Sequence, residues 1–347
     1  MRVLAVTNMY PSAADPVYGS FVARQMRSVV AAGAEVEILF VDGRSGHWAY
    51  FAAAFRVASA LRRRRFDVVH AHYGLTGFFA GLHRHPLVIS FCGDDLLGTP
   101  DGRGGIRPIS RVARMLSRLA ARRADAIICK SQSLRLSLTR EADRDRARVI
   151  PNGLDVSLFR PGDRARAREG LGVSATERLI LFPHSRRESA MKRFDLAEAA
   201  TAELRRRGYE ARLWVVNGVA PDGMPTYYHA ADCLLLTSLH EGSPNVVKEA
   251  LACDLPVVST DVGDVRRWLE LAPGGRLVAA DPTSVADGLQ ETLEGPRSVD
   301  GSGVRRLLSQ EVVAGAISEV YAEAIAARRG LPKATVLGLG GSDAGRD

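Results

Sequence analysis

Two glutamates stand eight positions apart in the stretch HEGSPNVVKEALACDLPVVS, residues 240–259. Glu241 precedes a cluster of small and polar residues, and Glu249 lies in the apolar segment that follows. Each has an ordinary explanation, because a single glutamate is most often a surface residue or the partner of a lysine or arginine. A carboxylate can also accept two hydrogen bonds from neighbouring hydroxyls of a sugar or a ribose. Because the two glutamates flank a polar cluster, we interpret them together as a site for sugar hydroxyls.

The cluster between the two glutamates is typical of a helix start. Pro244 suits the first turn of a helix, where its missing N–H costs nothing, and Ser243 is expected to be the N-cap. The unpaired N–H groups near Asn245 and Val246, together with the helix dipole, would then favour an anion such as a diphosphate. Gly242 lets a ligand approach the backbone closely.

Short apolar runs alternate with helical stretches along most of the chain, a pattern typical of βαβ units and parallel sheets. The runs RVLAVT, EVEILFV, DVVHAH, LVISF and DAIIC precede a linker near residues 148–155, and the pattern restarts with RLILFP. We therefore predict an α/β protein in which two Rossmann-like, doubly wound parallel-sheet domains face each other across a cleft. The expected units are residues 1–152, residues 153–308, a C-terminal helix over 309–330 that returns to the first domain, and a disordered tail over 331–347.

Composition restricts the partners and the compartment. The 347 residues are 46% hydrophobic and 25% charged, and their net charge of +8 favours an anionic partner such as a nucleotide, a phospholipid surface or a nucleic acid. Nucleic acid fits least, because the basic runs fall on separate predicted helices without interleaved aromatic residues.

The N-terminal residues are typical of a strand and not of a signal peptide, so a cytoplasmic location is expected. Scattered cysteines without a CxxC pair predict buried free thiols, not a metal site: Cys92, Cys129, Cys233 and Cys253.

Several segments together resemble those of a known enzyme family. Residues 240–265, HEGSPNVVKEALACDLPVVSTDVGDV, resemble the E-x7-E region of the retaining GT-B glycosyltransferases of family four, the glycosyl transferases group 1. PVYGSFVARQ is similar to the glycine loop of that family, with Gly19 in its place, and DVVHAHYG and VIPNGLD stand at the expected points. Tyr321 lies in a segment similar to the family's closing helix. The resemblance extends to about residue 328 and implies the GT-B fold.

The resemblance also implies roles for individual residues. Glu241 would contact hydroxyls of the donor sugar, Glu249 would bind the ribose, and the amides of residues 242–246 would hold sugar and phosphate. Lys192, with either Arg186 or Arg187, would neutralise the diphosphate leaving group. The first domain would take the acceptor and the second domain the donor.

The chain departs from the family at one motif of the first domain. Many members have a His-Gly-x-Asp run after the fourth strand, whereas this chain has SFCGDD, with Cys92 at the histidine position, followed by Gly93, Asp94 and Asp95. We expect Cys92 to form part of the pocket wall, because no activating base adjoins it in sequence. His72 either fills part of the gap or is a strand-end residue with its hydrogen bonds satisfied. The two adjacent aspartates alone are weak evidence for a metal site.

A second departure concerns the nucleotide base. Only fifteen residues separate Val216 from the next predicted strand at Asp232, which is too few for a further helix and strand. The region near the base is therefore expected to be reduced, with Asn217 and Gly218 as neighbours of the base or the ribose. The identity of the base stays open.

Taken together, the resemblance implies a retaining glycosyltransferase that moves a hexose from a nucleotide diphosphate sugar to a hydroxyl acceptor. The acceptor is a glycan, a small molecule or a lipid-linked compound at the inner membrane surface, and the last would make the protein peripheral to the membrane. No cofactor, metal or nucleic acid is expected, and the oligomeric state stays open. Two alternatives are a GT-B-like nucleotide-sugar epimerase and a non-enzymatic protein that binds sugar phosphates or nucleic acid. The Arg-rich segment 49–65 is interpreted as a core helix that covers the sheet, in preference to a membrane-docking helix.

Overall fold

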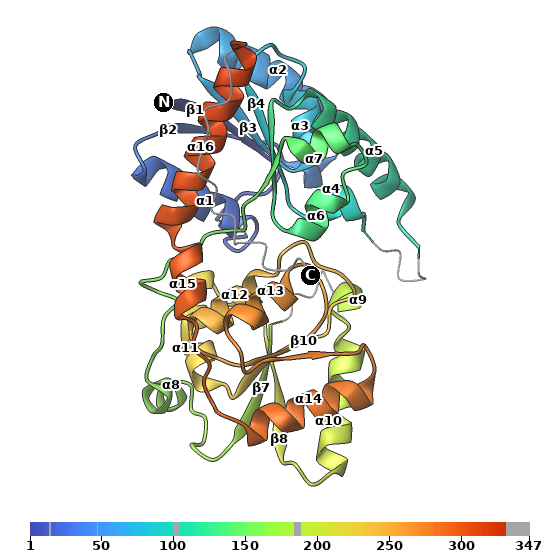
Figure 1. The fold of residues 1–347 in the computed structure, drawn as a ribbon, viewed down its shortest axis with the longest axis vertical. Helices are drawn as coiled ribbons and strands as arrows, with labels where there is room; N and C mark the ends of the chain where they lie inside the picture. The colour runs from blue at the N-terminus through green and yellow to red at the C-terminus, as the bar shows by residue number, and fades with distance from the viewer. Residues whose placement is uncertain (14, 47, 100–104, 184–188, 331–347) are drawn as a thin grey trace, which may run out of the picture.

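The computed structural model describes residues 1–13, 15–46, 48–99, 105–183 and 189–330. It consists of two α/β domains, each built on a parallel sheet, one above the other in Figure 1. The predicted fold class is confirmed: both sheets are parallel, with helices joining successive strands. The predicted disordered tail lies outside the described residues.

The first domain contains a six-stranded sheet with the order β2-β1-β3-β4-β5-β6. Strands β3, β4 and β5 are buried along their whole length, which explains why β4 and β5 are almost entirely apolar, while β3 also buries two histidines. The strands are β1 (Arg2–Thr7), β2 (Glu35–Phe40), β3 (Val68–His72), β4 (Leu87–Phe91), β5 (Ala126–Cys129) and β6 (Ala147–Val149). The helices are α1 (Ser20–Ala31), η1 (Gly43–Ser45), α2 (Trp48–Arg63), α3 (Gly74–Ala80), α4 (Asp94–Leu97), α5 (Pro108–Arg123), α6 (Gln132–Leu136) and α7 (Glu141–Asp145).

The second domain contains a five-stranded sheet with the order β11-β10-β9-β7-β8. Its strands are β7 (Arg178–Pro183), β8 (Ala211–Val216), β9 (Cys233–Leu236), β10 (Val257–Thr260) and β11 (Arg276–Val278). Its helices are α8 (Arg164–Gly170), α9 (Ser189–Lys192), α10 (Phe194–Arg206), η3 (Pro221–Gly223), α11 (Met224–Ala230), α12 (Asn245–Ala252), α13 (Val265–Leu271), α14 (Pro282–Glu294) and α15 (Ser302–Leu308). The segment between β8 and β9 holds η3 and α11 but no strand, in line with the short spacing in the sequence.

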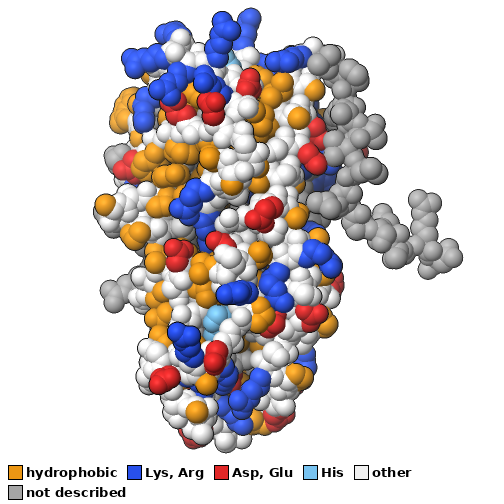
Figure 2. All heavy atoms as spheres, turned by 90° about the vertical axis from the view of Figure 1, so that its left-hand side faces the viewer, with side chains coloured by type: hydrophobic (Ala, Val, Ile, Leu, Met, Phe, Trp, Pro, Cys, Tyr) orange, Lys and Arg blue, Asp and Glu red, His pale blue; other side chains and the backbone are white. Residues whose placement is uncertain are grey.

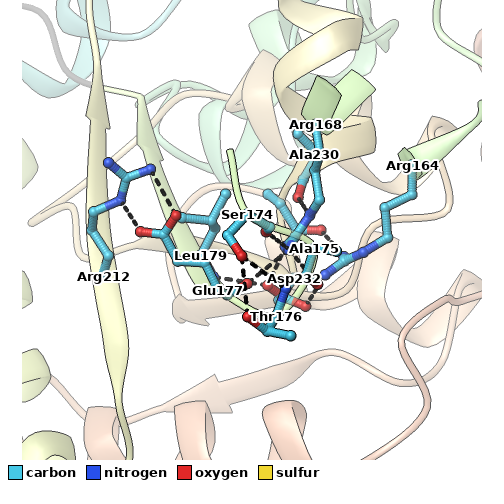
Figure 3. Close-up of polar contacts among 11 residues, drawn as sticks. Arg164, Arg168, Ser174, Ala175, Thr176, Glu177, Leu179, Arg212, Ala230 and Asp232 are labelled. Carbon is cyan, nitrogen blue, oxygen red and sulfur yellow. Dashed lines mark hydrogen bonds and ion pairs between the residues drawn. The ribbon is translucent and has the colours of Figure 1, made fainter. Parts of the chain in front are cut away.

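A buried ionic network fastens α8 to the amino-terminal edge of the second sheet (Figure 3). Asp232, just before β9, pairs with Arg168 at 2.9 Å and with Arg164 at 2.6 Å, and it also accepts the backbone N–H of Leu179. The remaining donors of Arg168 bind backbone carbonyls, those of Ser174, Ala175, Glu177 and Ala230. Because parallel sheets bind ligands at their carboxyl ends, this network stabilises the fold at the end remote from the expected site.

The last helix, α16 (Gln310–Arg328), leaves the second domain and packs on the first, against α1 and strands β3, β4 and β5 (Figure 1). Its Tyr321 is fully buried and its hydroxyl lies 2.6 Å from Nδ1 of His70 on β3. A second connection runs beside it, where the backbone N–H of Leu154 donates to the carbonyl of Leu308. The chain therefore crosses between the domains twice.

None of the helices in the described part of the chain is both long enough and apolar enough to cross a membrane.

Candidate active site

The two domains meet through loops at the carboxyl ends of their sheets. Gly93 follows β4 in the first domain, and Gly242 follows β9 in the second. A Cβ atom on Gly242 would lie 2.5 Å from the carbonyl oxygen of Cys92, so only glycine allows this approach. The loops that carry the SFCGDD and HEGSPN motifs are therefore in contact across the domain interface.

The helix after Gly242 begins one residue later than the sequence suggests. Pro244 is the N-cap of α12 and the first helical residue is Asn245, so the prediction of Ser243 as the N-cap is wrong. The hydroxyl of Ser243 instead donates to Asp264 at 2.8 Å and accepts from Nζ of Lys248 at 2.9 Å. Lys248 is fully buried and needs polar partners, which is the physical reason that the hydroxyl turns away from the helix end.

The amino end of α12 lies beside the segment that joins the two domains. Asn245 accepts a hydrogen bond of 3.2 Å from Asn152, in the segment that joins the two domains. Val246 is partly exposed beside it. The amino end of α12 thus lies where both domains can contribute to a bound anion.

Glu249 is 5% exposed and lies in a buried polar contact between the domains. Its Oε1 atom is 3.3 Å from Nη2 of Arg24, on α1 of the first domain, and its Oε2 atom accepts a hydrogen bond of 2.9 Å from the hydroxyl of Tyr228. Burial, followed by the nearby Glu249 charge, holds the pKa of Tyr228 well above its usual value, so the phenol is a donor. A carboxylate has about four lone-pair directions, so two remain for a ligand diol.

Arg24 is a site residue that the sequence analysis did not identify. Its Nε and Nη1 atoms are buried without a hydrogen-bond partner among the described residues, and its guanidinium carbon lies 5.7 Å from the centre of the Phe159 ring. Unpaired buried donors are costly, which makes this side chain a candidate ligand-binding group. The only sequence signal is an arginine among apolar residues in FVARQ, directly after the glycine loop.

Lys192 and Glu241 form an ion pair of 2.6 Å beside this interface. Oε1 of Glu241 also accepts from the hydroxyl of Ser238 at the end of β9. Lys192 ends α9, and the next residue, Arg193, has a φ of 51°, the left-handed conformation that glycine adopts most readily. The expected partners of Lys192 at the diphosphate, Arg186 and Arg187, lie outside the described residues.

Asp95 stabilises the loop after β4 by hydrogen bonds. Its carboxylate accepts backbone N–H groups from Gly74 at 3.0 Å, Cys92 at 3.1 Å and Gly93 at 2.8 Å. Burial raises the pKa of Asp95 to about 6, against the lowering effect of these hydrogen bonds. Burial also raises the pKa of the Cys92 thiol to about 12, so the group is neutral at ordinary pH. Among the described residues, no group of three or more His, Cys, Asp or Glu side chains is placed to hold a metal ion.

His72 is fully buried at the end of β3, and neither ring nitrogen has a partner among the described residues. The interpretation of His72 as a residue with satisfied hydrogen bonds is therefore wrong. Its ring lies 4.1 Å from that of His70, which is bound to Ser90 and Tyr321. Burial, with a contribution from His70, holds the pKa of His72 well below its usual value, so it is neutral.

A buried lysine, Lys130, completes the polar groups on the first-domain side. It follows β5, is 1% exposed, and donates to Oε1 of Gln25 at 3.1 Å. Burial lowers its pKa to about 8. A lysine at the carboxyl end of a buried strand, in AIICKS, is the signal that the sequence analysis overlooked.

Three further predicted residues lie in loops. Gly19 is the N-cap of α1 with a φ of 69°, and a side chain there would clash with the backbone of Met9. Asn217 and Gly218 are exposed at the carboxyl end of β8, and Gly218 has a φ of 70°. A ligand could therefore approach Asn217 and Gly218, whereas Gly19 is buried.

Comparisons with known proteins identify the family of this chain. Residues 2–153 match the family model described as a glycosyl transferase 4-like domain, and residues 188–295 match that of glycosyl transferases group 1. A D-inositol 3-phosphate glycosyltransferase of Frankia alni is 29% identical over 339 residues, which cover 84% of this chain and 80% of the relative. A protein of the same name from Acidothermus cellulolyticus is 28% identical, with 88% of this chain and 77% of the relative covered.

Solved structures share the fold. Sucrose-phosphate synthase from Thermosynechococcus elongatus superposes with a TM-score of 0.79 at 17% identity, over 94% of this chain and 100% of that one. HepE of Anabaena in complex with UDP-glucose gives a TM-score of 0.65 at 21% identity, over 94% of this chain and 99% of that one. The chain belongs to the GT-B glycosyltransferases that join a glycosyl transferase 4-like domain to a glycosyl transferases group 1 domain.

Proposed function

We propose that this glycosyltransferase moves a hexose, with retention of the anomeric configuration, from a nucleotide diphosphate sugar to a hydroxyl acceptor. The observation that supports this most is the position of Glu249, Glu241 and Lys192 around the amino end of α12. They supply a diol acceptor for the ribose, an acceptor for sugar hydroxyls and a cation for the diphosphate. Structural neighbours solved with UDP and with UDP-glucose make uridine the first base to test.

The site can support transfer on one face of the sugar without a protein base. The departing phosphate carries negative charge and can itself take the proton of the attacking hydroxyl. Lys192 and the amides that begin α12 would stabilise the charge that grows on the diphosphate. Among the described residues, the nearby Cys92 and His72 are a neutral thiol and a neutral imidazole, so neither supplies a carboxylate-like nucleophile. We propose that the transfer needs no metal ion, because these fixed charges replace it.

Proton NMR of donor turnover tests the proposal. The protein is incubated with α-linked nucleotide sugars alone, and then with a panel of acceptors that includes D-inositol 3-phosphate, named for the relatives, and a lipid extract. We expect release of the nucleotide diphosphate with an acceptor and an α-configured product. A β-configured product would refute retention, and a changed sugar in the donor without any acceptor would favour an epimerase.

A further inference from the structure

Two helices of the first domain expose large apolar side chains. On α2 these side chains follow a single stripe with helical spacing, and on α5 they occupy the first half of the helix. Their exposed fractions are 82% for Trp48, 53% for Phe51, 79% for Phe55, 56% for Ile109, 50% for Val112 and 55% for Met115. Only Tyr50, Ala53 and Val57 of α2 are buried, so the interpretation of segment 49–65 as a core helix accounts for one side of it alone.

These side chains belong to one face of the domain. Helices α2 and α5 both pack against α3, which lies between them (Figure 1). Phe51 of α2 contacts Phe79 of α3 edge to face at 5.1 Å, and Arg123 of α5 lies over Phe78 of α3 at 5.4 Å. Helix α2 follows β2 and α5 follows β4, and both lie on the same side of the sheet as α3. We call this surface, made by the exposed residues of α2 and α5, the α2–α5 face.

The α2–α5 face is strongly positive. Neither helix contains Asp or Glu, and together they contain eight arginines. For comparison, the net charge of the whole chain is +8. None of the eight forms an ion pair within the part of the chain that the structure describes. By contrast, arginines of the second domain such as Arg168, Arg207 and Arg276 are paired with carboxylates. Figure 2, which views the molecule from the left-hand side of Figure 1, shows Lys and Arg side chains gathered over the upper end of the first domain, where α2 lies, while α5 is on the far side of this view.

This chemistry fits an anionic lipid surface better than two other partners. A symmetric contact with a second copy would bring two sets of unpaired arginines together, which is unfavourable. Single-stranded nucleic acid would use aromatic residues along its whole path for base stacking, and here the exposed rings are on α2 alone, whereas the exposed apolar side chains of α5 are aliphatic. Aromatic and aliphatic side chains beside arginines are the composition of helices that lie in the membrane interface.

We propose that the α2–α5 face docks on a membrane rich in acidic phospholipids. Trp48, Phe51, Phe55 and the apolar residues of α5 enter the boundary between headgroups and acyl chains, and the arginines bind lipid phosphates. The first domain, the proposed acceptor side, then lies against the headgroups. Together with the proposed function, on which this last step rests, the docking identifies the acceptor as a hydroxyl compound borne by the membrane.

Co-sedimentation with lipid vesicles tests the docking without donor or acceptor. The full chain is mixed with phosphatidylcholine vesicles and with vesicles that also contain phosphatidylglycerol. We expect binding to the acidic vesicles only, weakened by salt. The double variant Trp48→Ser/Phe55→Ser should bind the acidic vesicles at least about tenfold more weakly, and Arg111→Ala about fivefold more weakly.

Matched controls are Leu136→Ser, an exposed apolar residue on α6, and Arg306→Ala, an exposed arginine on α15. Both should bind vesicles as the unchanged protein does. No binding to acidic vesicles, or equal loss in the controls, would overturn the proposal. So would concentration-dependent dimers that Trp48→Ser/Phe55→Ser abolishes, because a second copy would then cover the face. Nucleotide titration of the unchanged protein keeps the two proposals apart. Nucleotide binding without binding to acidic vesicles refutes the docking alone, and absence of nucleotide binding refutes the proposed function.

Discussion

Replacing Glu249 by glutamine changes charge with almost no change of shape, and two effects should follow. The Arg24–Glu249 pair is 3.3 Å long, and its side chains are 10% and 7% exposed. At that distance and an effective dielectric constant of about 20, the attraction is about 5 kcal/mol, part of which the cost of desolvation cancels. Breaking a buried pair at one partner typically costs about 3 to 5 kcal/mol, so we expect Glu249→Gln to lower the free energy of unfolding by about 3 kcal/mol.

The second effect concerns ligand binding. If Glu249 holds a ribose diol, the amide loses a charge-assisted acceptor worth about 1.5 to 3 kcal/mol, which weakens nucleotide diphosphate binding by about 10-fold to 150-fold. Urea unfolding and isothermal titration calorimetry measure the two effects separately. The control is Glu291→Gln, which breaks the exposed pair with Arg276 and should change stability by less than about 1 kcal/mol and leave nucleotide affinity unchanged. A folded Glu249→Gln variant with unaltered nucleotide affinity would refute the ribose role and leave Glu249 as a structural partner of Arg24.

Three further predictions concern the thiol, the buried lysine and the leaving group. Cys92→Ala should keep appreciable transfer at saturating donor, because burial raises the pKa of the thiol to about 12 and keeps it neutral; complete loss in a folded variant would show that the thiol acts directly. The pKa of Lys130 is lowered from 10.5 to about 8, so the native state penalises its charge below pH 8 and the penalty disappears as the pH rises towards 10.5. Between pH 8 and pH 10.5 the free energy of unfolding of the unchanged protein should therefore rise by about 3 kcal/mol relative to that of Lys130→Met. The same pH dependence of unfolding in both proteins would contradict this. EDTA should leave the transfer rate unchanged, whereas Lys192→Ala should lower it about 100-fold, or about 2.7 kcal/mol of barrier; loss of turnover on chelation and its return with Mg²⁺ would show a metal requirement.

Sequence patterns were sufficient for features that depend on neighbouring residues. The apolar runs predict the buried strands, and the C-terminal helix expected over 309–330 corresponds to α16, which spans Gln310–Arg328. The short spacing before Asp232 correctly predicts a second domain with no strand between β8 and β9. These features follow from local periodicity and length, which a single sequence carries.

Contacts between distant residues were not predictable in the same way. Ser243 has the chemistry of an N-cap, but its hydroxyl instead satisfies the buried Lys248, whose burial depends on tertiary packing. Arg24 reaches Glu249 over 225 positions of sequence only because the two domains dock. Segment 49–65 has apolar residues on more than one side, and periodicity cannot tell which of them the sheet covers.

The central claim is that a nucleotide diphosphate sugar binds at the domain interface through Lys192 and Glu249. Isothermal titration calorimetry with UDP, GDP and ADP and with their glucose conjugates tests it most directly, on the unchanged protein and on Lys192→Ala and Glu249→Gln. We expect at least one nucleotide to bind the unchanged protein with a dissociation constant below about 1 mM, the upper end of usual substrate affinities. Both variants should bind that nucleotide more weakly. Absence of binding by every nucleotide, or one affinity shared by all three proteins, would contradict it.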